Sequence, residues 1–116
     1  MKILGRFLFG LPLVSLSLGR QEIEFMVDTG FNGQVLIPHH LASELGLRDA
    51  GTADYVTADG ETAKAKVYVG ILEWFGERKE VFVVSTNTDF SLMGMGLLHE
   101  CRLIMERRKN ILEFER

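Results

Sequence analysis

The sequence predicts a small, closed, mostly β domain with one or two short helices. It has 116 residues, of which 47% are hydrophobic. This length and composition suit one domain with a modest core, and the chain is too short for two domains. Short apolar or alternating runs recur along the chain, and turn-forming residues separate them. No repeat, low-complexity tract or linker divides the chain, so we expect residues 1–116 to form a single domain.

The first third of the chain predicts strands joined by tight connections. Val14, Leu16 and Leu18 occupy every second position of one run, which is the period of a half-buried strand. Gly19 and Arg20 then predict a hairpin turn. The expected strands cover residues 3–9, 13–18, 21–27 and 34–37.

A short helix is expected next, from Pro38 to about Leu45. Proline suits the first turn of a helix. Leu41 and Leu45 are four residues apart, so they share one helix face. Gly46 is the residue type that ends a helix in the left-handed conformation.

A long hairpin is expected in the middle of the chain, with strand 55–58 leading into a turn at Asp59-Gly60 and strand 61–74 leading out of it. Asp-Gly is among the strongest signals for a tight turn. The continuous apolar run 81–84 predicts a strand that is buried on both faces. The remaining expected elements are strands at 79–85, 92–94, 102–106 and 110–114 and a one-turn helix at 97–100.

The charge and cysteine content exclude several classes of function. The formal net charge is -3 and the acidic and basic residues are interleaved, which argues against nucleic-acid binding. The basic cluster within residues 106–109 is expected to be a solvated turn. Cys101 is the single cysteine, so an internal disulfide and a cysteine metal site are both excluded, and we expect a buried thiol in or beside a strand.

The apolar N-terminus is expected to form strands and not a targeting segment. Arg6 interrupts the apolar region, and no small-residue cleavage site of a signal peptide follows it. The stretch is also too short and too broken to span a bilayer. We therefore expect no membrane association and a cytoplasmic location.

Asp28, Thr29 and Gly30 are the residues that point most directly to chemistry. They follow an apolar strand, so one carboxylate is expected at a tight turn that glycine permits. On these three residues alone, an aspartate that caps a turn is the favoured interpretation. Two later features strengthen the catalytic interpretation: the segment 92–94, which ends in glycine, and the Asp-Gly hairpin that lies between the two motifs.

With these motifs in this order, the chain resembles the retropepsin-like (clan AA, retroviral-type) aspartic proteases, and most closely their prokaryotic members. The resemblance implies a closed, β-barrel-like acid protease fold. It also implies that Asp28 is the catalytic carboxylate, that Thr29 joins two active-site loops across a dimer axis, and that Gly30 leaves room for the substrate backbone. The segment 92–94 would support the loop that carries Asp28.

The resemblance also implies a substrate-binding flap at the long hairpin, formed by Thr57, Ala58, Asp59 and Gly60. Phe31 stands where viral members carry a small residue, so it is expected to narrow or reshape the cleft. Gly96 stands where the family usually has aspartate or asparagine at the start of the short helix.

One chain supplies one Asp28, so the resemblance implies a homodimeric endopeptidase that hydrolyses peptide bonds in a peptide or protein substrate. Two neighbouring carboxylates share one proton, and the ionised one activates a water molecule. No metal or other cofactor is expected, and His39-His40 is a poor chelating pair because adjacent helix residues point in different directions. The alternative is a catalytically silent peptide-binding or dimerisation module of the same fold.

Overall fold

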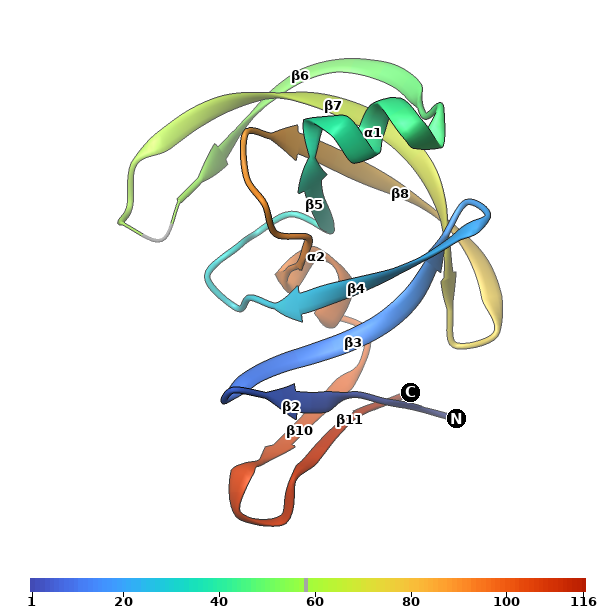
Figure 1. The fold of residues 1–116 in the computed structure, drawn as a ribbon, viewed down its shortest axis with the longest axis vertical. Coiled ribbons are helices and arrows are strands. Elements are labelled where there is room, and N and C mark those ends of the chain that lie inside the picture. The colour runs from blue at the N-terminus through green and yellow to red at the C-terminus, as the bar shows by residue number, and fades with distance from the viewer. Residues whose placement is uncertain (58) are drawn as a thin grey trace.

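The computed structural model describes residues 1–57 and 59–116, which form two β-sheets and short helices (Figure 1). The strands and helices, in chain order, are β1 (Lys2–Leu4), β2 (Arg6–Leu8), β3 (Leu11–Leu18), β4 (Gln21–Val27), β5 (Val35–Pro38), α1 (His39–Leu45), β6 (Arg48–Val56), β7 (Thr62–Trp74), β8 (Glu77–Thr86), β9 (Leu92–Met93), α2 (Met95–Leu98), β10 (Arg102–Glu106), the 3-10 turn η1 (Arg107–Lys109) and β11 (Ile111–Glu115).

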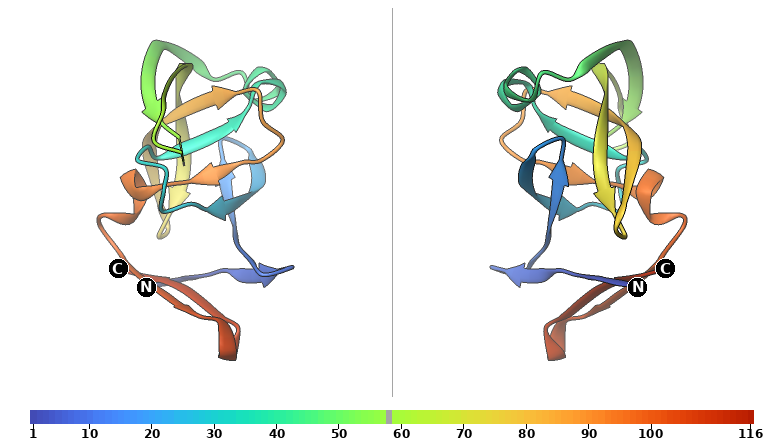
Figure 2. Two further views of the ribbon diagram at one scale, coloured as in Figure 1. Left: turned by 90° about the vertical axis from the view of Figure 1, so that its left-hand side faces the viewer. Right: turned by 90° about the vertical axis from the view of Figure 1, so that its right-hand side faces the viewer.

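Eight of the strands form one sheet in the order β2-β3-β4-β9-β5-β8-β7-β6. An additional pairing between β3 and β7, at Leu18 and Leu72, bends this sheet back on itself. The result is a barrel-like, mostly β fold, as the sequence predicted. The remaining strands form a second sheet in the order β1-β11-β10, where the two chain termini meet (Figure 2).

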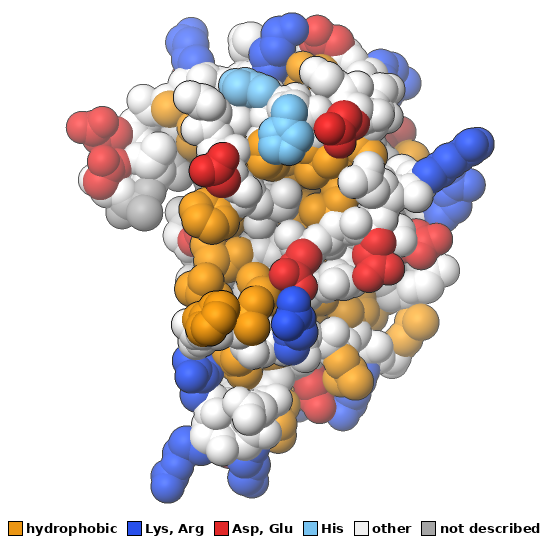
Figure 3. All heavy atoms as spheres, viewed as in Figure 1, with side chains coloured by type: hydrophobic (Ala, Val, Ile, Leu, Met, Phe, Trp, Pro, Cys, Tyr) orange, Lys and Arg blue, Asp and Glu red, His pale blue; other side chains and the backbone are white. Residues whose placement is uncertain are grey.

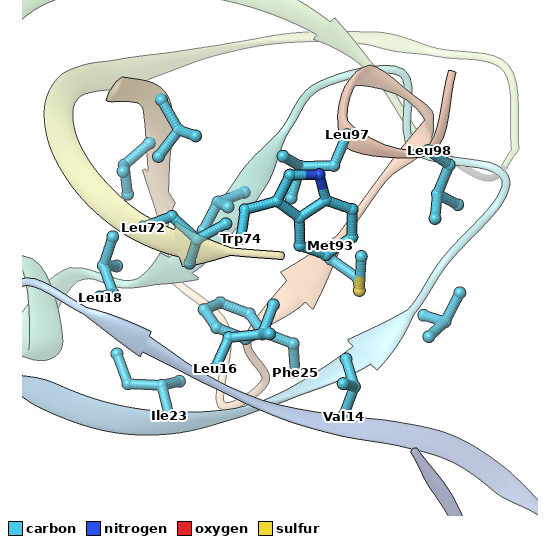
Figure 4. Packing of buried hydrophobic residues seen from close by; sticks show 14 of the residues in the cluster. Val14, Leu16, Leu18, Ile23, Phe25, Leu72, Trp74, Met93, Leu97 and Leu98 are labelled. Carbon is cyan, nitrogen blue, oxygen red and sulfur yellow. The ribbon is translucent and has the colours of Figure 1, made fainter. Parts of the chain in front are cut away.

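The hydrophobic core fills the space inside the curved sheet (Figure 4). Trp74 lies at its centre and packs edge-on against the rings of Phe75 and Phe114, with ring centroids 4.8 and 6.1 Å away. Leu18 and Phe25 are fully buried around it. Burial of large side chains of this kind contributes about 1.5–3 kcal/mol each, so this cluster provides the rigid support on which the loops are held.

The N-terminal strand differs from the prediction because it is divided at Gly5. β1 pairs with β11, whereas β2 pairs with β3 in the other sheet. A Cβ atom on Gly5 would lie 2.5 Å from the Leu112 side chain and 2.6 Å from the Leu13 carbonyl oxygen. The chain therefore crosses from one sheet to the other at the one residue that fits this narrow gap.

The first strand of the long hairpin is the largest departure from the prediction. β6 begins at Arg48, whereas strand 55–58 was expected. It is an edge strand and almost wholly exposed, so its sequence carries no apolar alternation. Backbone hydrogen bonds to β7 hold it instead, with a bulge between Asp49 and Thr52 where Gly51 has φ +97°.

Two smaller expectations were also wrong. The side chain of Phe82 is 60% exposed, so the run 81–84 is not buried on both faces of β8, although Val81, Val83 and Val84 are buried. The short helix α2 begins at Met95, two residues before the expected start, because Gly94 provides its extended N-terminal residue. Helix α1 ends at Gly46 with φ +60°, as predicted.

The helices of the described residues are all short. None of them is long and apolar enough to cross a membrane.

Candidate active site

Asp28 lies at the point where β4 leaves the sheet. Its backbone N–H donates a hydrogen bond to the Met93 carbonyl (2.9 Å), which continues the parallel pairing of β4 with β9. Its side chain is half-buried, and its Oδ1 atom accepts a hydrogen bond from the Gly30 N–H (2.9 Å). The buried sheet thus fixes the backbone of Asp28, and the turn that follows fixes its carboxylate.

The loop that follows Asp28 rests on the start of α2. The Met95 N–H donates to the Phe31 carbonyl (2.8 Å), and the Gly94 N–H donates to the Gln34 carbonyl (3.0 Å). A Cβ atom on Gly94 would lie 2.4 Å from the Phe31 carbonyl oxygen, closer than any side chain can approach. The segment 92–94 is therefore in direct contact with the Asp28 loop, where the resemblance had suggested it.

Gly96 makes the same kind of contact. Its N–H donates to the Gly33 carbonyl (3.0 Å), and a Cβ atom at this position would lie 2.8 Å from the Gly33 carbonyl carbon. An aspartate or asparagine, as expected for the family, would collide with the loop in this protein. Glycine at this position therefore fits the close approach of α2 to the loop.

The tip of the β6–β7 hairpin is an exposed turn. The Thr57 N–H donates to the Glu61 carbonyl (2.9 Å), and the Gly60 N–H donates to the Thr57 carbonyl (3.0 Å). Asp59 accepts hydrogen bonds from the Thr57 hydroxyl and the Glu61 N–H, and the Thr57 hydroxyl is the main reason that the pKa of Asp59 lies below its usual value. Ala58, predicted to bind substrate, lies outside the described residues.

A cavity of about 220 Å³, here called the inner cavity, lies between the Asp28 loop and residues 55–57, which lead into the tip of this hairpin. Of the predicted site residues, the structure brings Asp28, Gly30, Phe31 and Thr57 together around it. Thr29 is exposed in the turn, and Asp59 and Gly60 lie at the hairpin tip; these three do not line the inner cavity. Their predicted roles involve a second chain or a closed flap and stay predictions.

Sequence reasoning missed several residues of the cavity wall. Tyr55 and Val56 precede the predicted turn, and their place in the hairpin was a signal that could have found them. Thr86 and Thr88 follow β8 without any motif, so only the fold brings them to the site. The complete described lining is Asp28, Gly30, Phe31, Leu36, Tyr55, Val56, Thr57, Thr86, Thr88 and Leu92.

The histidines and the cysteine lie apart from the inner cavity. The Nδ1 atom of His39, at the start of α1, lies 2.8 Å from the Ser85 hydroxyl. Cys101 is half-buried just before β10, and burial raises the pKa of its thiol. Within residues 1–57 and 59–116, no three His, Cys, Asp or Glu side chains form a group that could hold a metal ion.

A closed, mostly β fold in which an Asp-Thr-Gly loop rests on a short internal strand defines the class of retropepsin-like aspartic proteases. The chain belongs to the family described as "gag-polyprotein putative aspartyl protease", whose model matches residues 14–100. The resemblance predicted from the motifs is thereby confirmed.

A solved structure extends the likeness to nearly the whole chain. A retropepsin-like aspartic protease from Rickettsia conorii is similar with 26% sequence identity and a TM-score of 0.69, covering 98% of this chain and 88% of that chain. The expected resemblance to a prokaryotic retropepsin-like protease is thus confirmed at the level of the fold. A search of curated proteins found no match.

Proposed function

We propose that this chain is a homodimeric aspartic endopeptidase in which Asp28 and its counterpart from a second copy activate water to hydrolyse a peptide bond. The observation that carries the proposal is the half-buried Asp28 carboxylate in the wall of the inner cavity, beneath a long hairpin. The family membership supports the same assignment.

The chemistry follows from two carboxylates held close together. Like charges at short distance do not both ionise readily, so the pair holds one shared proton. The ionised Asp28 takes a proton from a water molecule between the two carboxylates. That water attacks the amide carbonyl, while the protonated Asp28 donates a hydrogen bond to the developing oxyanion. The proton that Asp28 took from the water then passes to the leaving nitrogen as the C–N bond breaks.

The flap assignment extends this proposal. Tyr55, Val56 and Thr57 contribute one wall of the inner cavity from the hairpin that would cover a bound peptide. The tip at Asp59 and Gly60 is exposed and has few packing partners, so its closure over a substrate costs little free energy. Once the peptide is bound, the tip would shield the site from bulk solvent, with the attacking water retained between the two carboxylates.

A symmetric dimer completes the site. The Asp28 loop and the β6–β7 hairpin both reach the left-hand edge of Figure 1, and hydrophobic side chains gather along that edge in Figure 3. A contiguous exposed apolar patch is typical of an interaction surface. The exposed large apolar side chains of this chain include Leu8, Phe9, Leu11, Phe90, Met95 and Met105.

The three-stranded sheet offers a second contact for a partner chain. β1 and β10 form its two edges, and each presents unpaired backbone groups of the kind that add strands from another chain. We expect strands from residues 3–9 and 102–114 to contribute to the interface, with Asp28 near the two-fold axis.

Cleavage of a diverse peptide library by the wild type and by Asp28→Asn tests the proposal. Asparagine is nearly the same size as aspartate but does not exchange the proton, so we expect hydrolysis to be lost while the fold and the dimer persist. Circular dichroism and sedimentation of both proteins provide the control. Peptide binding without cleavage by the wild type would instead support the silent binding module, and equal cleavage by both proteins would exclude Asp28 as the catalytic group.

A further inference from the structure

The ring of Phe31 occupies a space that two glycines leave free. A Cβ atom on Gly33 would lie 2.5 Å from Cζ of the ring, and one on Gly94 would lie 2.5 Å from Cδ2. Only 3% of Phe31 is exposed, and the ring packs in a small apolar cluster with side chains from β5, β7 and β8. Its position is therefore set by the backbone on both sides and by the core beneath it.

This ring lies between two hollows of the surface. One is the inner cavity beside Asp28. The other, here called the outer groove, has a volume of about 390 Å³ and is mostly apolar, with Val67, Phe82 and Val84 among its lining residues. Among the described residues, Phe31 and Tyr55 line both hollows, so these two side chains form the wall between them.

Phe31 is the fixed half of this wall. Its backbone N–H donates to the Asp28 carbonyl (3.2 Å), and its carbonyl accepts from Met95 (2.8 Å). Tyr55, in contrast, is partly exposed and belongs to the hairpin that would open and close. The Asp28 loop and the start of α2 therefore hold the backbone of Phe31 in place without any contribution from the hairpin.

We propose that Phe31 is a specificity-determining residue that limits the inner cavity to uncharged side chains of aliphatic size. The lining supports this class of ligand: among the residues that the structure describes, Asp28 is its one charged group, and aliphatic side chains combine there with the hydroxyls of Thr57, Thr86 and Thr88. An indole at this position would meet the Phe31 ring, whose atoms lie close against the backbone at Gly33 and Gly94. The inference rests on the proposed function, because it places a peptide side chain next to Asp28.

The test measures peptide binding without turnover. Two peptides carry a non-hydrolysable hydroxyethylene group in place of the scissile bond, one with a valine and one with a tryptophan side chain beside it. Their dissociation constants are measured by calorimetry for the wild type, Phe31→Leu, Phe31→Ala and Phe82→Ala. The last variant is a matched control, since it removes a ring from the outer groove alone.

The wild type is expected to bind the valine peptide at least about tenfold more tightly than the tryptophan peptide. Phe31→Ala should erase or reverse this preference, Phe31→Leu should give an intermediate value, and Phe82→Ala should leave it unchanged. If Phe31→Ala does not fold, Phe31→Leu carries the comparison, since it shortens the same side chain with a smaller loss of volume.

A second pair of variants tests the ring position directly. Gly33→Ala places a methyl group against Phe31 and should alter the valine-to-tryptophan ratio without removing the ring. The same change made in Phe31→Ala should have no further effect on the ratio, because the colliding ring is absent. A merely structural role of Gly33 would give equal effects in both backgrounds.

Three outcomes would overturn the inference. The ratio of dissociation constants is the same in the wild type and the Phe31 variants, the wild type binds the tryptophan peptide more tightly than the valine peptide, or the wild type binds neither peptide. Cleavage of the corresponding natural peptides is measured in parallel. If the binding ratios are as expected but no peptide is cleaved, the role of Phe31 is supported and the proposed hydrolysis is contradicted. If peptides are cleaved but the ratio is the same in all variants, the proposed hydrolysis is supported and the role of Phe31 is contradicted.

Discussion

At the scale of single residues, the positions beside the Asp28 loop are determined by how closely the backbone segments approach. Gly94 and Gly96 both lie against carbonyl groups of this loop, and neither position has room for a Cβ atom. Their φ angles are not in the left-handed region, so the requirement for glycine comes from close packing and not from backbone conformation.

Gly94→Ala is therefore expected to lower the free energy of unfolding by about 1–3 kcal/mol, because the added methyl group displaces the Phe31 and Gly33 carbonyls. Chemical denaturation measures the change. Gly70→Ala is the matched control, since its Cβ atom would meet side-chain carbons at 3.1–3.3 Å, and not backbone carbonyls at 2.4–2.5 Å as in Gly94→Ala. A larger loss for Gly70→Ala than for Gly94→Ala would mean that the loop contact is not tight.

The proposed pair of Asp28 side chains predicts a bell-shaped dependence of activity on pH. Catalysis needs one ionised and one protonated carboxylate, so activity falls when both are protonated and when both are ionised. We expect the maximum on the acidic side of neutrality. Initial rates of peptide cleavage across the pH range measure the profile, and a rate that rises steadily into alkaline solution would contradict a carboxylate pair.

The candidate site was predictable where its residues carry a motif. Asp28 and Gly30 follow an apolar strand, and Thr57 precedes an Asp-Gly turn, so both parts of the cavity wall had a local signal. Thr86 and Thr88 had no such signal. Thr86 reaches the cavity through the parallel pairing of β5 with β8, which joins residues almost fifty positions apart, and Thr88 follows it two residues later. Site residues of this kind can be identified only when the pairing of the strands is known.

At the scale of elements, a strand was predicted correctly where one of its faces is buried, because burial requires apolar residues at alternate positions. β3 and β4 have one face in the core, and their apolar alternation predicted them correctly. β6 lies at the edge of its sheet with nearly all of its residues exposed, so hydrogen bonding to β7 defines it and leaves no hydrophobic pattern. The division between β1 and β2 was missed for a related reason, since Gly5 marks a change of partner strand.

The hairpin tip gives a prediction of its own. Gly60 has φ +86°, a conformation that a β-branched residue adopts only with strain, and it lies in exposed surroundings. We expect Gly60→Val to reduce kcat/KM at least about tenfold, with a loss of stability of about 1–2 kcal/mol at most. Peptide cleavage and chemical denaturation are measured on the same preparation.

Gly19→Val serves as the control for strain alone, because Gly19 also has a positive φ, of +65°, and lies in the β3–β4 turn. This variant is expected to show a similar loss of stability and nearly unchanged turnover. Equal losses of turnover in the two variants would mean that the β6–β7 tip has no special part in catalysis.

At the scale of the whole molecule, the protein is half of the proposed catalytic unit. The given sequence has one Asp-Thr-Gly motif, and the described residues form one barrel-like unit around it. The exposed apolar side chains near the chain termini include Leu4 and Phe9, and the latter is 95% exposed. Burial of such side chains between two copies would stabilise a dimer.

Specific activity is consequently expected to fall on dilution below the dissociation constant of the dimer, because a monomer contains half a site. Peptide cleavage over a range of protein concentrations, with sedimentation at the same concentrations, measures this dependence. An active species that sediments as a monomer would exclude the shared site.

The most direct test of the shared site is to titrate a fixed amount of wild type with Asp28→Asn, after equilibration that allows chains to exchange. With ninefold excess of the variant, random pairing leaves about a tenth of the wild-type chains in wild-type dimers, so activity per wild-type chain should fall to about a tenth. Native mass spectrometry verifies that mixed dimers have formed. Full activity per wild-type chain in the presence of those mixed dimers would contradict a site built from two Asp28 residues.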